Sequence, residues 1–304
     1  MATGRSSFMH MTVFGAGYSG KAIADLYRQA GHAVSGTTRS VEKFGSLQAL
    51  GIEPLQFDGT ALSPELKQAL AKTTHLLQSI APGRDGDALL RLAGHDLRSL
   101  MPQLQWIGYL STVGVYGDHQ GGWVTEETPC KPVSARSLER VEAETNWLAA
   151  GKQIGVPVAV LRLSGIYGPG RNAFANLANG TARRLVKPDQ VFNRIRVEDI
   201  AGATVFLADR LLGGIYNITD NEPCAPQDVV VEAARLMGVE PPPEQPFETA
   251  ELSSMARSFY GENKRVSNAL LKQLGFAFRY PDYRLSLQQL WASDTWRKEA
   301  ADPA

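Results

Sequence analysis

Three glycines at fixed spacing stand near the start of the chain, at Gly15, Gly17 and Gly20. A GxGxxG turn binds phosphate when a strand precedes it and a helix follows, because N–H groups at the helix N-terminus then face the anion. Gly15 would permit the tight turn, Gly17 would let the backbone approach a diphosphate, and Gly20 would let helix and strand pack closely. The alternative is a purely structural turn, because the pattern alone is weak.

The segments on either side of the turn supply the context that the pattern needs. Residues 11–14 form a short apolar run typical of a buried strand. Apolar residues then recur at helical spacing as far as a glycine suited to a left-handed cap, namely Ile23, Leu26, Tyr27, Ala30 and Gly31. This order predicts a dinucleotide site along the whole turn, including Ala16, Tyr18 and Ser19.

The end of the next strand, expected at residues 33–38, indicates which dinucleotide binds. An acidic residue at this point would bond the adenosine ribose of NAD. The chain instead has Arg39 followed by Ser40. A guanidinium group offers planar donors to a 2′-phosphate and a face for adenine, so the sequence predicts NADP, with NAD as a possible substitute. The alternative for Arg39 is a solvated loop arginine.

Strand-like and helix-like segments alternate along the chain and predict an α/β protein with a Rossmann-type doubly wound parallel sheet. Further strands are expected at 54–57, 75–80, 106–111 and 158–163, and helices at 64–72, 87–100 and 137–151. Ligands bind beyond the carboxyl ends of such strands. That rim is expected to hold Asp58, Ser79, Ile80, Ala81, Ser111 and Thr112.

The chain divides into a dinucleotide-binding domain and a smaller C-terminal α/β lobe expected to bind substrate. The expected limits are a flexible tail at 1–10, the domain at 11–168, a return to its core at 191–219, and the lobe at 169–304. Within the lobe we expect helices at 228–237 and 266–274 and a stiff loop at 240–244. Its Arg257, Lys264 and Arg265 suit an anionic substrate; the alternative is solvated surface cations.

The composition excludes several classes of partner. Lys plus Arg and Asp plus Glu number 31 each, so no bulk field favours nucleic acid or an anionic membrane. Cys130 and Cys224 lie far apart, which suits a reducing compartment, and no apolar run approaches the length of a membrane span or signal peptide. We therefore expect a cytoplasmic protein. The five histidines lack ligand spacing, so no metal is expected.

In this order, the motifs resemble the extended short-chain dehydrogenase/reductase superfamily, which contains NAD-dependent sugar-nucleotide epimerases and dehydratases. Residues 111–117 are similar to its catalytic serine/threonine segment, with Thr112 in the position of the active hydroxyl. Residues 161–170 are similar to the segment that passes the nicotinamide, and 196–201 and 215–218 match two later landmarks. The resemblance covers nearly the whole chain.

This resemblance implies further roles for the rim. Asp58 would meet the adenine, and Ile80 with Ala81 would line the middle of the cofactor; the alternatives are the start of a loop for Asp58 and a core position for Ile80. The expected helices at 87–100 and 137–151 resemble those through which relatives pair, which implies a possible homodimer.

The chain departs from the family at its tyrosine and lysine, which stand four residues apart. Aligning Glu144 with the family's glutamate puts Arg140 in the lysine position and Arg136 in the tyrosine position. Arginine cannot hand over a proton as a phenol can. We expect Arg136 to stabilise an oxyanion and Arg140 to bond the nicotinamide ribose. The alternative is an exposed charged face of Arg136, Glu139, Arg140 and Glu144, opposite Leu138, Val141, Thr145 and Leu148.

Two tyrosines are candidates for the missing acid. Tyr116 and Tyr167 are expected in loops at the rim, where a cation lowers a phenol's pKa; the alternative for each is packing. Without the Tyr–Lys pair, the chain is more similar to the atypical branch of the superfamily. We expect an NADP-dependent oxidoreductase, or an epimerase/dehydratase, acting on a small carbonyl or hydroxyl compound. The alternative is a non-catalytic protein that senses NADP(H).

Overall fold

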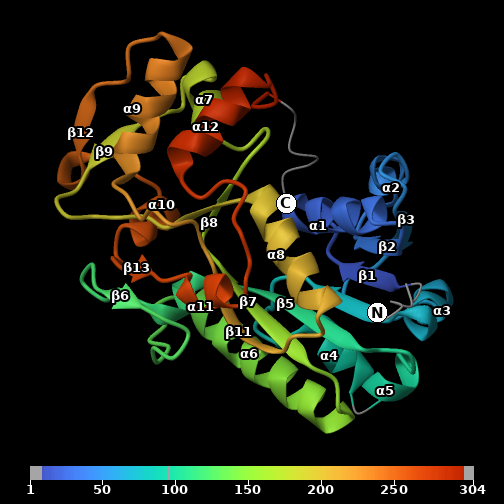
Figure 1. Ribbon diagram of the computed structural model, residues 1–304. Helices are drawn as coiled ribbons and strands as arrows, with labels where there is room; N and C mark the ends of the chain where they lie inside the picture. The colour runs from blue at the N-terminus through green and yellow to red at the C-terminus, as the bar shows by residue number, and fades with distance from the viewer. Residues whose placement is uncertain (1–8, 95, 298–304) are drawn as a thin grey trace.

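The chain folds around one parallel sheet. The computed structural model describes residues 9–94 and 96–297, and its central sheet has the strand order β11-β7-β5-β4-β1-β2-β3 (Figure 1). The strands are β1 (His10–Phe14), β2 (Ala33–Thr38), β3 (Glu53–Gln56), β4 (His75–Gln78), β5 (Trp106–Thr112), β7 (Val158–Leu163) and β11 (Gly214–Ile218). Every ladder in it is parallel, and the order reverses beside β1, where such sheets bind ligands. The predicted Rossmann-type fold is confirmed.

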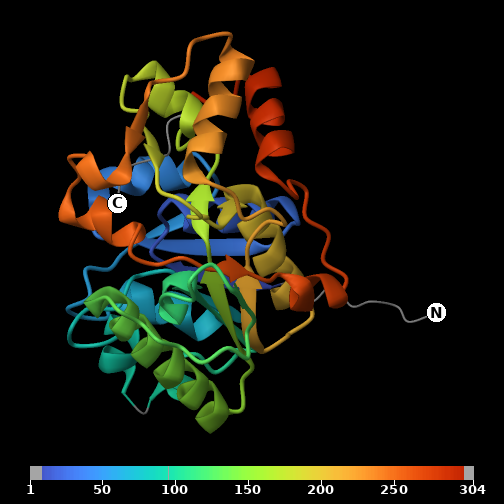
Figure 2. The ribbon, with the colours of Figure 1, turned by 90° about the vertical axis from the view of Figure 1, so that its left-hand side faces the viewer.

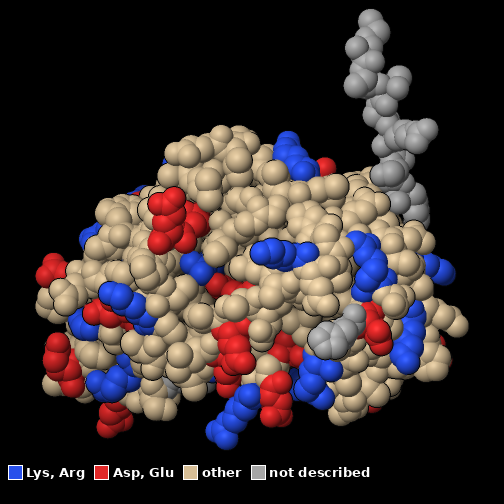
Figure 3. All heavy atoms as spheres, turned by 90° about the horizontal axis from the view of Figure 1, so that it is seen from below, with Lys and Arg blue, Asp and Glu red and all other residues tan. Residues whose placement is uncertain are grey.

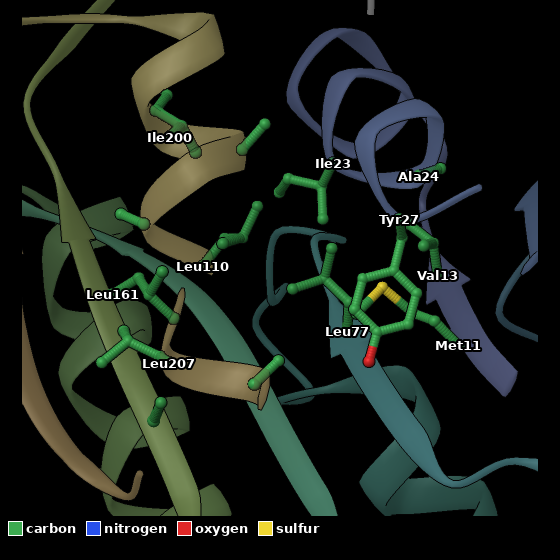
Figure 4. Packing of buried hydrophobic residues seen from close by; sticks show 14 of the residues in the cluster. Met11, Val13, Ile23, Ala24, Tyr27, Leu77, Leu110, Leu161, Ile200 and Leu207 are labelled. Atoms are coloured by element: carbon green, nitrogen blue, oxygen red, sulfur yellow. The ribbon is translucent and has the colours of Figure 1, made fainter. Parts of the chain in front are cut away.

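Helices cover both faces of the sheet. One face carries α1 (Tyr18–Gln29), α2 (Phe44–Gln48) and α8 (Val197–Asp209), and the other carries α3 (Pro64–Lys72), α4 (Ala88–Ala93), α5 (Leu97–Leu100) and α6 (Ala135–Ile154). Figure 4 shows Ile23 and Tyr27 of α1 and Ile200 of α8 over the strands. Because both faces are covered, β7 is buried along its whole length.

The smaller lobe lies above the carboxyl ends of the strands (Figures 1 and 2). Its helices are α7 (Ala173–Ala178), α9 (Pro226–Met237), α10 (Ser254–Phe259) and α12 (Tyr283–Ala292), whereas α11 (Ala269–Gln273) packs on the central sheet beside β11. Strand pairs join distant segments: β6 (Trp123–Val124) with β13 (Arg265–Val266), β8 (Gly165–Tyr167) with β10 (Arg194–Arg196), and β9 (Arg184–Val186) with β12 (Glu244–Pro246). Single 3-10 turns are η1 (Val41–Lys43), η2 (Val113–Tyr116) and η3 (Phe247–Thr249).

Three local expectations were wrong. The helix expected at 87–100 is interrupted by Gly94, whose φ of +54° ends α4 before α5 begins. The helix expected at 266–274 is preceded by strand β13, because Val266 pairs with β6 and its N–H donates to the side chain of Asn193 (2.8 Å). His10 belongs to β1 and not to a tail, since its buried ring bonds Ser35 (2.8 Å). Residues 1–8 of the expected tail lie outside the described residues.

The visible surface agrees with the balanced composition. Figure 3 shows both acidic and basic side chains spread over the face seen from below. Across residues 9–94 and 96–297, no helix combines the length and the apolar character needed to cross a lipid bilayer.

Candidate functional site

The glycine turn has the geometry of a phosphate-binding loop. Gly15 has φ of +84°, and a Cβ there would lie 2.9 Å from Cγ1 of Ile80. A Cβ at Gly20 would lie 2.6 Å from the carbonyl oxygen of Gly15, so this position also excludes a side chain. Gly17 differs, because within the described chain a Cβ there would meet no atom within 4 Å. Two glycines therefore permit close packing, and the third faces open space.

Helix α1 presents its N-terminus to that space. Its N-cap, Gly17, provides no side-chain hydrogen bond, and its first turn, which includes Tyr18 and Ser19, holds no acidic residue. Thr37 of β2 holds the glycine turn in place. Its Oγ1 accepts a hydrogen bond from Gly15 N (2.9 Å), and its carbonyl oxygen accepts one from Ala16 N (2.9 Å). Unpaired N–H groups and the helix dipole favour an anion at this point. These residues fit the diphosphate of a dinucleotide.

The end of β2 carries both signs of charge. Arg39 is exposed, and its carbonyl oxygen accepts from Nε2 of Gln56 (3.3 Å). The hydroxyl of Ser40 donates to the carboxylate of Glu42, and this bond lowers the pKa of Glu42. Ser40, expected to bind the cofactor, thus already has a partner. Glu42, which stands three residues beyond Arg39, is a nearby carboxylate that was not expected at this site.

Asp58, expected to meet adenine, is exposed after β3. Its carboxylate accepts from the backbone N–H (2.9 Å) and the hydroxyl (2.6 Å) of Thr60, and these bonds lower its pKa. Asp58 therefore begins a loop, and its contact with adenine stays a prediction. Ile80 packs against Gly15 and is partly buried on the core beneath α3 to α6. Ser79 is partly buried beside it.

A cavity of about 890 Å³ opens at the carboxyl ends of β4, β5 and β7. Side chains from the sheet, from α6 and from the lobe line it, among them Ala81, Thr112, Arg136, Glu139, Arg140 and Arg171. The structure thus brings together three of the four expected catalytic residues. Arg171 was missed, although it directly follows the segment expected to pass the nicotinamide.

Thr112 and Arg140 are held in place at the end of β5. Oγ1 of Thr112 accepts from Gly114 N (3.1 Å), which leaves its O–H proton for a ligand. Nη1 of Arg140 donates to the carbonyl oxygen of Leu110 (2.5 Å), and the Arg140 side chain also lines the cavity. This pair can donate to an oxygen atom in the cavity.

Helix α6 presents the exposed charged face that the alternative described only in part, because Arg136 is exposed and Glu139 and Arg140 are half-buried. Arg136, Glu139 and Arg140 lie on one side of the helix and line the cavity, while Glu144 is buried. Leu138, expected on the buried side, is 56% exposed. The charged side of α6 therefore faces the site.

Glu144 holds together the strands beneath the cavity. Its Oε1 accepts from the hydroxyl of Ser111 on β5 (2.5 Å) and from Nε of Arg162 on β7 (3.1 Å), and its Oε2 accepts from Nη2 of Arg162 (2.7 Å). Both side chains of the ion pair are about 95% buried. Ser111 is therefore part of a buried network, and the expectation that it reaches the rim was wrong.

The same correction applies to Tyr116. Its ring stacks under the guanidinium of Arg162, 4.8 Å from the ring centroid, and its hydroxyl donates to Oδ1 of Asn217 (2.7 Å). The side chain is fully buried, and burial raises its pKa. Tyr116 is a packing residue because its proton is engaged away from the cavity.

The ring of Tyr167 lines the cavity, but its hydroxyl is buried and burial raises its pKa far above the ordinary value.

One of the three lobe cations reaches the cavity. Lys264 is buried in its wall, where Nζ donates to the carbonyl oxygen of Gly117 (2.8 Å) and to Glu262 (2.5 Å). Arg257 and Arg265 lie outside the cavity lining and donate to backbone carbonyls. Lys264 is therefore more a structural cation than a ligand for a substrate.

Asp220, two residues after β11, is a buried carboxyl group. Its N–H donates to the carbonyl oxygen of Arg194 (2.8 Å), and its Oδ1 accepts from Glu222 N (3.0 Å). Within the described chain, Oδ2 has no hydrogen-bond partner. Burial raises the pKa of Asp220 to about 7, although the positive charge of Arg194 acts to lower it.

We expect Asp220→Asn to flatten the pH dependence of stability. The folded pKa lies above the unfolded value of about 3.9, so the folded state holds its proton more tightly, and the free energy of unfolding falls as pH rises from about 4 to 7. Urea unfolding should show the variant more stable by roughly 2–4 kcal/mol at about pH 8, by about 1–2 kcal/mol at about pH 5 and little changed at about pH 3.5. Exposed Asp85→Asn is the control; parallel profiles for Asp220→Asn and the unaltered chain would contradict this account.

Comparisons with known proteins agree with this geometry. The model of the NAD dependent epimerase/dehydratase family matches residues 103–219. Protein YeeZ of Escherichia coli (strain K12) is 31% identical over 287 residues, covering 90% of this chain and 96% of that protein. A solved structure of a functionally unknown conserved protein from Silicibacter pomeroyi DSS is 43% identical, with a TM-score of 0.87, covering 94% of this chain and 99% of that one.

More distant structures share the fold. The dTDP-glucose 4,6-dehydratase of Bacillus anthracis str. Ames, solved in complex with NAD, has a TM-score of 0.74 at 19% identity, covering 95% of this chain and 98% of that one. The family model and the near-full-length likeness to YeeZ decide the assignment. The chain belongs to the NAD-dependent epimerase/dehydratase family.

Proposed function

We propose that this chain is an NADP-dependent oxidoreductase acting on a small anionic carbonyl or hydroxyl compound. The observation that carries the proposal is the cavity of about 890 Å³, in which Thr112, Arg136 and Arg140 lie together at the carboxyl ends of the strands. The cavity lining holds five cationic side chains, Arg136, Arg140, Arg171, Arg194 and Lys264, and two carboxylates, Glu139 and Glu262. This excess of positive charge favours an anionic compound.

The residues of the chain would act on the substrate oxygen. A bound nicotinamide coenzyme supplies or accepts the hydride. Thr112 donates its O–H to the oxygen, and the guanidinium of Arg140 stabilises the negative charge that develops there in the reductive direction. Arg136 contributes a second cation. Water entering the open cavity then supplies the proton that a tyrosine supplies in the family.

The choice of NADP rests on Arg39, and it gives a prediction. Arg39→Ala should lower affinity for NADPH by about 10- to 100-fold, because a charged hydrogen bond is worth about 1.5–3 kcal/mol. Affinity for NADH, which lacks the 2′-phosphate, should change by less than about 2-fold. Calorimetric titration of both coenzymes measures this, with exposed Arg235→Ala on α9 as the control. Tighter binding of NADH than of NADPH by the unaltered chain would contradict the NADP proposal.

Hydride transfer itself is tested with a panel of small 2-oxo acids, phosphorylated aldehydes and neutral aldehydes, following the loss of NADPH absorbance. We expect turnover with anionic members. Thr112→Val should lower kcat by about 100-fold or more, because it removes one donor to the reacting oxygen. NADPH affinity should be unchanged. Preference for the neutral aldehydes, or full activity of Thr112→Val, would contradict the assigned roles.

A second candidate is a non-catalytic protein that binds NADP(H) and reports its redox state to a partner. The observation in its favour is that Arg136, a group without a transferable proton, occupies the expected tyrosine position on α6. Tight NADPH binding without turnover of any member of the panel would favour this function.

A further inference from the structure

A tight turn at residues 168–171 lies against the start of α1. Gly168 N donates to the carbonyl oxygen of Arg171 (2.9 Å), and Arg171 N donates to that of Gly168 (3.1 Å). The hydroxyl of Tyr18, the first residue of α1, donates to the carbonyl oxygen of Pro169 (3.0 Å). A Cβ at Gly168 would lie 2.7 Å from that hydroxyl oxygen, so the contact leaves no room for a side chain. The turn is thus fixed to the glycine loop.

The residue after the turn adds rigidity. Nδ2 of Asn172 donates to the carbonyl oxygens of Gly168 (2.8 Å) and Trp296 (2.9 Å), and its Oδ1 accepts from Ala175 N (3.0 Å) as the N-cap of α7. Asn172 is buried. The backbone that carries Arg171 is therefore held from both sides.

Arg171 carries a charge at the border between the glycine loop and the cavity. Its side chain is exposed, lines the cavity, and has its guanidinium carbon 5.9 Å from the centroid of the Tyr18 ring. The nearby carboxylate of Glu198 is held by the buried guanidinium of Arg196 (2.7 Å). Positive charge from Arg171 is thus available at the N-terminus of α1.

We propose that Arg171 binds the diphosphate of the coenzyme, at the phosphate on its nicotinamide side. This inference rests on the coenzyme proposed above. The diphosphate bridge carries two negative charges, and the N-terminus of a helix supplies the equivalent of about half a positive charge. A guanidinium group is suited to binding phosphate, and its charge offsets much of the negative charge that the helix N-terminus leaves uncompensated. Its position in the lining shared with Thr112 and Arg140 places it toward the nicotinamide end.

The experiment compares Arg171→Gln with the unaltered chain by calorimetric titration of three ligands. NADPH and 2′-phospho-ADP-ribose contain both bridging phosphates, whereas adenosine 2′,5′-bisphosphate lacks the phosphate on the nicotinamide side. We expect about 10- to 100-fold weaker binding of the first two and less than about 2-fold change for the third. Arg171→Lys should recover part of the loss, since it keeps the charge without the planar fork.

Exposed Arg183→Gln in the same lobe is the matched control and should bind all three ligands normally. Thermal unfolding of each variant checks that the turn is intact. NADPH binding by Arg171→Gln at the affinity of the unaltered chain would overturn the inference, as would an equal loss for all three ligands. If the unaltered chain binds neither NADPH nor NADH, the coenzyme proposal itself is overturned. If the unaltered chain binds NADPH and Arg171→Gln binds it equally well, only the inference about Arg171 is overturned.

Discussion

Glu144→Ala is expected to lower the free energy of unfolding by about 3–5 kcal/mol, because it leaves the guanidinium of Arg162 buried without its counter-ion. The same change removes the acceptor of Ser111 and loosens the stack on Tyr116. Urea unfolding followed by circular dichroism measures the loss. The large effect follows from burial, since exposed ion pairs contribute about 1 kcal/mol or less.

Glu142→Ala is the matched control, because Glu142 lies on the same helix and is exposed. Its free energy of unfolding should change by about 0.5 kcal/mol or less. A second comparison separates the unpaired charge from lost packing: Glu144→Leu combined with Arg162→Met should be far less destabilising than Glu144→Ala, since no charge is left buried. If Glu144→Ala and Glu142→Ala cost the same, the ion pair does not hold the strands beneath the cavity.

Local patterns were sufficient to predict the fold and the glycine loop. The strands at 33–38 and 158–163 and the helix at 64–72 begin and end at the residues predicted from the sequence. Apolar runs and spacing carry this information because buried parallel strands and amphipathic helices are encoded by neighbouring residues. The position of the glycine turn needed no contact between distant segments.

Roles that depend on side-chain direction were harder to predict. Ser111 and Thr112 are adjacent on β5 and point to opposite sides, so the hydroxyl of Ser111 meets Glu144 and that of Thr112 faces the cavity. Tyr116 is drawn inward by Arg162 and Asn217, which lie 46 and 101 residues further along the chain. A sequence pattern does not show such distant partners, and for the same reason Arg171 went unnoticed.

The second large effect is expected at Gly17. Gly17→Val should weaken NADPH binding by about 100-fold or more, because the branched side chain fills the space beside the N-terminus of α1 where the diphosphate would lie. The fold should tolerate the change: φ of −83° and ψ of −155° suit valine, and no described atom lies within 4 Å of the added Cβ. The loss of stability should be about 1 kcal/mol or less. Titration calorimetry and urea unfolding measure the two quantities separately.

Two other glycines make this test specific to the diphosphate. Gly45→Val on α2 also meets no described atom within 4 Å and should leave NADPH affinity unchanged. Gly20→Val should instead destabilise the fold, because its Cβ would lie 2.6 Å from the carbonyl oxygen of Gly15. Of these three variants, only Gly17→Val should weaken NADPH binding without a large loss of stability, because only Gly17 combines open space with the N-cap position of α1. Undiminished NADPH binding by Gly17→Val would place the coenzyme elsewhere and remove the basis of the proposed function.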